Sequence, residues 1–219
     1  MKVISTNLGD PVEVVWRGKT IQTGIFKYPV SQPLLLETED VQHDHVIDRR
    51  YHGGVDKACY IYGVENYEFW KQRYPDLDWQ WGMFGENLTI AGINESEMNI
   101  GDIYRLGETL VQITQPRQPC FKLGFRFGTQ QIVHEFQQEP YPGVYVRVLK
   151  CGSVSVGDQM QLEERAQDSL SLATVFSLLM TDRNNIDLLK KAIALPDLAE
   201  TCRNDLKKIL TFAQRNSEK

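Results

Sequence analysis

The chain has 219 residues, of which 42% are hydrophobic and 24% charged, and its formal net charge is −5. This composition is typical of a folded globular protein with a sizeable core, and no stretch approaches the roughly 20 apolar residues of a membrane helix. The acidic balance argues against sequence-independent binding of nucleic acid. Because no secretory signal follows Met1, we expect a cytoplasmic protein whose partners include neither a membrane nor a nucleic acid polymer.

The first 165 residues alternate short segments rich in β-branched residues with Gly and Pro, a pattern that predicts strands. Helical spacing appears only at residues 64–74, as a crossover helix, and near 129–138. We therefore expect a mainly β domain of the α+β class, a closed or half-closed β-barrel with peripheral helices. The predicted strands are residues 1–6, 12–16, 20–27, 34–38, 57–62, 87–90, 102–106, 109–115, 144–149 and 159–163.

Composition changes near Arg165, which predicts a barrel domain at residues 1–165 and a small three-helix domain at 166–219. Asp168, Ser169 or Ser171 can cap the first helix, residues 184–194 continue helically, and Pro196 suits the first turn of the last helix. Fewer than about 60 residues bury too little surface for a secure fold. We expect this segment to dock on the barrel or on another subunit, so a homodimer stays open.

Cys120 is the strongest candidate for chemistry. It lies in Gln115-Pro-Arg-Gln-Pro-Cys-Phe-Lys, where Pro116 and Pro119 restrict the backbone and hold the thiol in a stiff loop. No carboxylate occurs in residues 117–127, and surrounding cations favour the thiolate that binds soft metals or attacks electrophiles. The alternative is a half-buried cysteine in a proline-rich turn. The cations of this segment are Arg117, Lys122 and Arg126.

The other cysteines are weaker candidates, because Cys59 lies in an apolar strand, Cys151 ends one and Cys202 falls on the core stripe of the last helix. The four cysteines contain no C-x-x-C pair, so we expect reduced thiols and neither a disulfide scaffold nor a structural zinc site.

A second constellation combines glycines with cations. Two glycines let the backbone approach a ligand and present N–H groups to an anion, which indicates an anion-binding loop. A turn histidine without function is the alternative reading. The segment is Arg49-Arg50-Tyr51-His52-Gly53-Gly54-Val55-Asp56-Lys57.

Two further segments contain polar side chains that could bind a ligand. In Phe84-Gly85-Glu86-Asn87-Leu88, Asn87 offers donor and acceptor groups for a heterocycle and Glu86 a group that can handle a proton, although a β-turn before a strand explains the segment equally well. His43-Asp44-His45 is more readily a solvated strand end than a metal site, since no third and fourth ligand are suitably spaced.

The order His-Gly-Gly-x-Asp-Lys-Ala, Phe-Gly-Glu-Asn-Leu, Gly-Asp and Gln-Pro-Arg-x-Pro-Cys resembles the MOSC family, especially its bacterial YiiM-like members. The resemblance covers about residues 1–165, and the terminal helices resemble the helical domain of that subgroup. It implies a barrel that binds the pterin-based molybdenum cofactor, with Cys120 as molybdenum ligand and catalytic residue. His52 is a second catalytic candidate. Residues implied in cofactor binding are Arg49, Arg50, His52, Gly53, Gly54, Lys57, Glu86, Asn87 and Arg117.

The resemblance further implies reduction of N-hydroxylated compounds, such as hydroxylaminopurine base analogues, to amines. Because the sequence has no flavin, haem or iron–sulfur motif, we expect an external electron-donor reductase. Trp79, Trp81 or Tyr62 are candidates to stack on a purine.

Two other functions stay open. A sulfur carrier would hold a persulfide on Cys120, although no pyridoxal-phosphate desulfurase domain is attached and we expect no pyridoxal phosphate binding. A non-catalytic module would store or deliver the cofactor through the same pocket.

Overall fold

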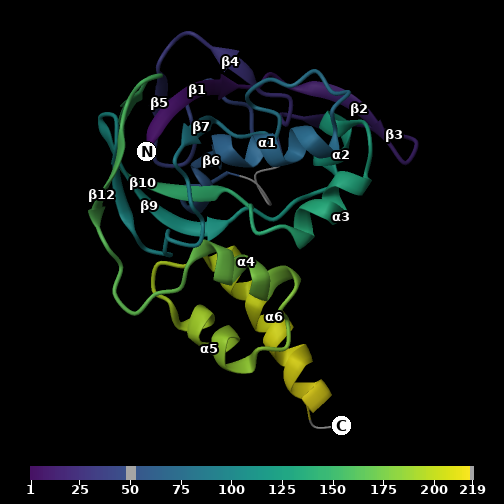
Figure 1. The fold of residues 1–219 in the computed structure, drawn as a ribbon, viewed down its shortest axis with the longest axis vertical. Coiled ribbons are helices and arrows are strands. Elements are labelled where there is room, and N and C mark those ends of the chain that lie inside the picture. Colours follow the sequence, from purple (N-terminus) through teal and green to yellow (C-terminus); the bar gives the residue numbers. More distant parts are fainter. Residues whose placement is uncertain (48–52, 218–219) are drawn as a thin grey trace.

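The structure, a computed structural model, describes residues 1–47 and 53–217. A large mixed sheet forms its upper part in Figure 1, and helices flank the sheet and lie beneath it. The sheet order is β12-β8-β9-β10-β6-β7-β1-β4, and every neighbouring pair is antiparallel except β6 and β7. Its strands are β1 (Lys2–Leu8), β4 (Tyr28–Val30), β6 (Cys59–Gly63), β7 (Leu88–Ala91), β8 (Ile103–Leu106), β9 (Thr109–Pro116), β10 (Val144–Lys150) and β12 (Met160–Glu164).

The predicted α+β class is confirmed, but the sheet curls without closing into a barrel. Its β12 end approaches β1, where Lys2 forms an isolated bridge with Gln159 and the Val3 amide donates to the carbonyl of Asp158 at 2.9 Å. In the described residues, no continuous ladder joins β1 to β12. The sheet is therefore less closed than the predicted barrel. Closure depends on long-range strand register, which local sequence patterns do not encode.

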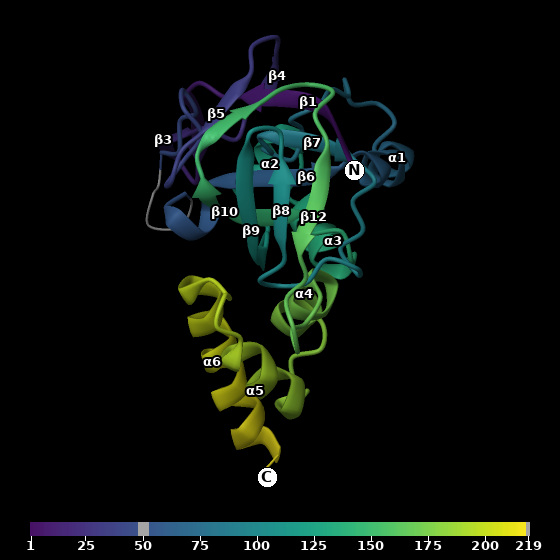
Figure 2. The same ribbon diagram turned by 90° about the vertical axis from the view of Figure 1, so that its left-hand side faces the viewer.

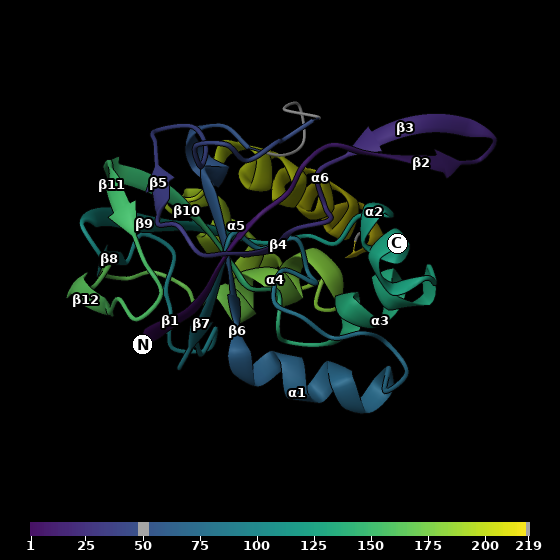
Figure 3. The same cartoon turned by 90° about the horizontal axis from the view of Figure 1, so that it is seen from above.

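Two short strand pairs accompany this sheet. The hairpin of β2 (Val12–Trp16) and β3 (Lys19–Thr23) turns at Arg17 and Gly18, which both have positive φ, as a two-residue turn of twisted strands requires. Figure 3 shows the hairpin extending away from the body of the protein. The other pair consists of β5 (Leu34–Leu36) and β11 (Gly152–Val154).

Helix α1 (Val64–Arg73) connects β6 to β7, and the parallel pairing of these strands confirms the predicted crossover. Tyr67 and Trp70 on its inner face are fully buried. Helix α3 (Gln131–Gln138) was also predicted, whereas α2 (Lys122–Phe127) was not. The sequence hid α2 because it is only six residues long and contains Gly124, a weak helix former.

Three helices follow the sheet: α4 (Leu172–Met180), α5 (Ile186–Ala194) and α6 (Glu200–Ser217). Ser171, one of the three predicted caps, accepts a hydrogen bond from the Thr174 amide at 3.2 Å. The prediction for Pro196 was wrong, because α6 begins at Glu200 and Pro196 lies in the preceding connection. Within the described residues, no helix combines the length and apolar character needed to cross a membrane.

The helical segment packs directly against the sheet, as Figure 2 shows from the side. Leu178 of α4 and Leu206 of α6 belong to the same hydrophobic cluster as Val111 and Ile113 of β9. The amide of Ala199 also donates to the carbonyl of Thr114 at 3.1 Å. Docking on the sheet is thus observed, while the division of the chain at residue 165 stays a prediction.

We expect Leu206→Ala to lower the free energy of unfolding by about 2–5 kcal/mol, because it removes a fully buried side chain from the cluster shared by α6 and the sheet. Phe212→Ala on the same helix is the control, since Phe212 is 66% exposed and its loss should cost less than about 0.5 kcal/mol. Urea unfolding measures both. Equal effects would show that α6 does not share the core of the sheet.

Candidate functional site

A pocket of about 680 Å³, its open mouth included, lies where β9, β10 and the segment before β7 meet the short helix η1 (Val55–Lys57). The structure brings together five residues that the sequence predicted from three separate segments. These lining residues are Gly53, Lys57, Asn87, Arg117 and Cys120.

Cys120 owes its position to the end of β9. The strand stops at Pro116, and the Leu123 amide donates to the Cys120 carbonyl at 3.0 Å as α2 begins. The thiol is half-buried at the pocket wall. In contrast, Cys59 and Cys202 are fully buried, and burial raises the pKa of each thiol to about 12. Cys120 is therefore the cysteine that combines accessibility with a pocket.

Arg117 is a buried cation with unused bonding capacity. Only 5% of it is exposed, and its guanidinium lies over the rings of Tyr60 and Phe136, at 5.6 and 5.0 Å from the ring centres. Its Nη1 atom is buried and has no hydrogen-bond partner among the described residues. An unfilled buried donor is costly, so this geometry suits an anionic ligand bound beside Cys120.

The pocket has an excess of positive charge although the chain is acidic. Its described lining contains four cations, Lys27, Lys57, Arg117 and Lys122, and a single carboxylate, Asp44. Burial lowers the pKa of Lys57, while Cys202, Asp205 and Asp56 oppose that shift. Such a lining attracts a group of negative charge, for example a phosphate.

Asn87 is held by a network that the sequence did not reveal. Asp44 forms a buried ion pair with Lys27 and accepts a hydrogen bond from Asn87 Nδ2 at 3.0 Å. The Tyr60 amide donates to Asn87 Oδ1 at 3.3 Å. The sequence indicates for Asp44 only a place in a solvated His-Asp-His segment. Its partner Lys27 lies 17 residues away. A long-range pair of this kind leaves no signal in local spacing.

The structure does not bring Glu86 into the pocket. Its carboxylate is fully buried and accepts hydrogen bonds from the Tyr67 hydroxyl, the Gly82 and Phe84 amides and the Thr89 hydroxyl. Burial raises the pKa of this carboxyl, and the hydrogen bonds from Tyr67 and Thr89 oppose that shift. Glu86 thus fixes the loop before β7.

The proposed purine-stacking residues lie elsewhere as well. Tyr62 is fully buried in an aromatic cluster, and Trp79 and Trp81 pack against Tyr67 there. The aromatic residues that line the pocket are Tyr60, Phe84 and Tyr145.

The glycine loop is only partly described. Gly53 and Gly54 have φ values of 75° and 82°, the left-handed conformation that glycine adopts easily. The Gly54 amide donates to the Glu39 carbonyl at 3.0 Å, so this N–H group is already used in a hydrogen bond within the protein. Arg49, Arg50 and His52 lie outside the described residues, and their roles stay predictions. His45 contacts Asp10 at 3.7 Å and the Gly9 carbonyl at 3.2 Å.

The chain belongs to the MOSC family, because the MOSC domain matches residues 48–161, slightly more than half of its length. The relatives make it a YiiM-like member. The crystal structure of YiiM from Geobacillus stearothermophilus matches with a TM-score of 0.80 and 32% identity, covering 95% of this chain and 98% of that one.

Two further relatives match this chain over different shares of their own length. YflK of Bacillus subtilis (strain 168), an uncharacterized protein, is 38% identical over 92% of this chain and 90% of its own. A protein of Gibberella moniliformis (strain M3125 / FGSC 7600) named Reductase is 31% identical over 82% of this chain, which spans only 32% of that protein.

We expect iodoacetamide to label Cys120 and Cys151 in the native protein, and Cys59 and Cys202 at least roughly 100-fold more slowly, because the latter two are buried and their thiols have raised pKa values. Inorganic phosphate should slow labelling of Cys120 but not of exposed Cys151. Mass spectrometry of the cysteine peptides measures each rate. Equal protection of both cysteines by phosphate would contradict an anion site at Cys120.

We expect Glu86→Gln to lower the free energy of unfolding by about 1–3 kcal/mol, because the amide group places donors where carboxylate oxygens accept four hydrogen bonds. Glu65→Gln is a matched control, since exposed Glu65 accepts one backbone hydrogen bond, from Gly92, that an amide oxygen can keep. Thermal unfolding of both variants tests the difference. Comparable stability of the two variants would argue against a structural role for Glu86.

Proposed function

We propose that this protein binds the molybdenum cofactor in the Cys120 pocket and reduces N-hydroxylated compounds, such as hydroxylaminopurine base analogues, to amines. The observation that carries this proposal is the buried Nη1 atom of Arg117, which has no hydrogen-bond partner among the described residues, in the same pocket as the half-buried Cys120. Membership of the MOSC family supports binding of the cofactor. The relative named Reductase supports redox chemistry.

The side chains of the pocket suit the two ends of such a cofactor. A thiolate is a soft ligand appropriate for molybdenum, and Cys120 supplies it. The cations Arg117, Lys57 and Lys122 suit the terminal phosphate, with Arg117 able to donate from its unfilled Nη1. Asn87 also lines the pocket and would offer a hydrogen-bonding group to a pterin ring, although Asp44 and Tyr60 already use part of its amide.

When bound, the cofactor supplies two-electron redox chemistry, by which an N-hydroxyl group, two protons and two electrons give an amine and water. The residues of the chain bind and orient the cofactor and the substrate. Tyr60, Phe84 and Tyr145 provide aromatic surface at the pocket and limit the access of water. Burial raises the pKa of Tyr145 to about 12, so its phenol stays protonated well above neutral pH.

The electrons come from a separate donor reductase in this proposal. In the Gibberella relative, about two thirds of the protein lies outside the stretch that matches this chain. Space for an additional functional segment therefore exists in that protein. Cytoplasmic location and formation of a homodimer stay predictions.

A sulfur-carrier or cofactor-delivery function is the second candidate, and the accessibility of Cys120 favours it. A half-buried thiol in a cationic pocket can also hold a persulfide. A persulfide on Cys120 after incubation with a cysteine desulfurase, without bound molybdenum, would select the carrier function. Bound pterin without turnover of any N-hydroxylated compound would select storage or delivery.

We expect near-stoichiometric molybdenum and pterin in native protein purified from cells that make the cofactor, and loss of molybdenum in Cys120→Ala, because the thiolate is the proposed metal ligand. Cys151→Ala is the control, since Cys151 is exposed and does not line the pocket. Elemental analysis and pterin fluorescence measure the two contents. Native protein with neither molybdenum nor pterin would overturn the cofactor proposal.

A further inference from the structure

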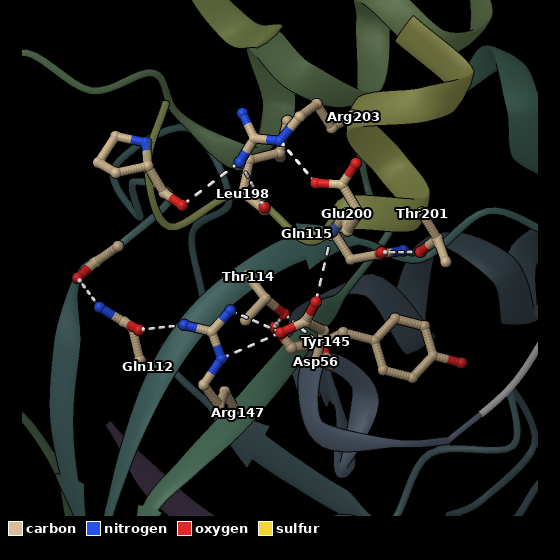
Figure 4. Close-up of polar contacts among 12 residues, drawn as sticks. Asp56, Gln112, Thr114, Gln115, Tyr145, Arg147, Leu198, Glu200, Thr201 and Arg203 are labelled. Carbon is tan, nitrogen blue, oxygen red and sulfur yellow. Dashed lines mark hydrogen bonds and ion pairs between the residues drawn. The ribbon is translucent and has the colours of Figure 1, made fainter. Parts of the chain in front are cut away.

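The carboxylate of Asp56 joins two elements that are remote in sequence (Figure 4). Arg147 of β10 donates to its Oδ1 atom twice, from Nε at 3.0 Å and from Nη2 at 2.5 Å. The amide of Glu200, the first residue of α6, donates to Oδ2 at 3.3 Å. Asp56 itself belongs to η1, the turn that also carries Lys57 of the pocket.

The backbone of Asp56 is tied to β9. The Thr114 hydroxyl lies 2.6 Å from the Asp56 carbonyl, to which it donates, and the Thr114 carbonyl accepts from the Ala199 amide at 3.1 Å. One residue further along, Gln115 Oε1 accepts from the Thr201 hydroxyl at 3.2 Å. The same strand end leads, within six residues of Thr114, to both Arg117 and Cys120.

Helix α6 therefore contacts Asp56, next to Lys57, and Gln115, at the strand end that leads to Arg117. Beyond its first turn, Asp205 accepts from Gln118 Nε2 at 3.3 Å, in the loop between Arg117 and Cys120. Asp205 and Cys202 of α6 also act electrostatically on Lys57. Contacts that begin in the C-terminal helix thus reach the segments that carry Lys57 and Arg117.

We propose that Asp56 is a positioning residue, which uses Arg147 and the first turn of α6 to hold Lys57 in place relative to Arg117 and Cys120. The helical segment would then be part of the anion-binding machinery. This inference rests on one part of the proposed function, that the pocket binds an anion. It does not depend on which cofactor or substrate binds there. The alternative is an ordinary brace that adds stability without affecting the pocket.

A second arginine–carboxylate pair in the same sheet offers a matched control. Arg105 of β8 donates to Glu163 of β12 from Nε at 3.2 Å and from Nη2 at 2.8 Å. No residue of these two strands lines the pocket. Arg147→Lys and Arg105→Lys both keep the charge and lose the two-pronged geometry of the guanidinium.

The test compares how fast anionic iodoacetate and neutral iodoacetamide modify Cys120 in the full chain, measured by mass spectrometry of its peptide. The ratio of the two rates reports positive charge near the thiol, and partial unfolding changes both rates together. We expect Arg147→Lys to lower this ratio roughly threefold or more, the effect of moving one cation several ångströms away. Arg105→Lys should leave it unchanged. Exposed Cys151 is the internal reference.

A charge-neutral double variant, Asp56→Asn with Arg147→Gln, should lower the ratio at least as much as Arg147→Lys, and its control is Glu163→Gln with Arg105→Gln. If the variants at Asp56 and Arg147 lose thermal stability while the ratio stays at its native value, Asp56 is only a brace and the inference is wrong. If native Cys120 shows no higher ratio than Cys151, the pocket is not cationic at the thiol, and both the inference and the proposed anion site fail.

Discussion

The end of β9 is the constraint on which the site depends. Proline has no N–H to continue a ladder, and Pro116 is the last residue of this strand. The chain must therefore leave the sheet there, next to β10 and η1, and the residues that follow are Arg117 and Cys120. β10 pairs with β9 up to Gln115 and Pro116, whereas the pairing of β9 with β8 stops at Gln112, so β10 is the strand that holds this exit point. The strand end thus leads both Arg117 and Cys120 to the lining of one pocket.

The cations of the pocket differ in whether the protein itself provides a partner for their charge. Lys27 is neutralised by Asp44, so that pair is satisfied within the protein. Arg117 has aromatic rings and no carboxylate within ion-pair distance among the described residues, and one of its donors is unfilled. A bound anion would fill that donor and, by binding only the folded state, would stabilise the protein. This difference separates a structural cation, Lys27, from one that is available to a ligand.

Local sequence patterns predicted what is determined locally. The apolar alternation of β10 and the helical spacing of α1 are visible in the sequence, and two prolines sufficed to mark the Cys120 loop. Features that depend on distant partners were not predicted. The buried carboxylate of Glu86, for example, accepts a hydrogen bond from the Tyr67 hydroxyl of α1, and Glu86 does not line the pocket. The Lys27–Asp44 pair and the incomplete pairing of β1 with the β12 end likewise depend on the assembled fold.

The position of α6 gives a physical reason for the small helical segment. It is too short to bury a secure core alone, and its leucines complete the hydrophobic cluster beneath β9. The surface it covers is the far side of the strand end that carries Arg117. Ala199, Glu200 and Thr201 join the start of the helix to that strand and to η1, the two segments that carry Arg117 and Lys57 to the pocket. A cationic pocket opposes its own formation through repulsion between like charges, so it needs such external support, and here the support comes from residues far along the chain.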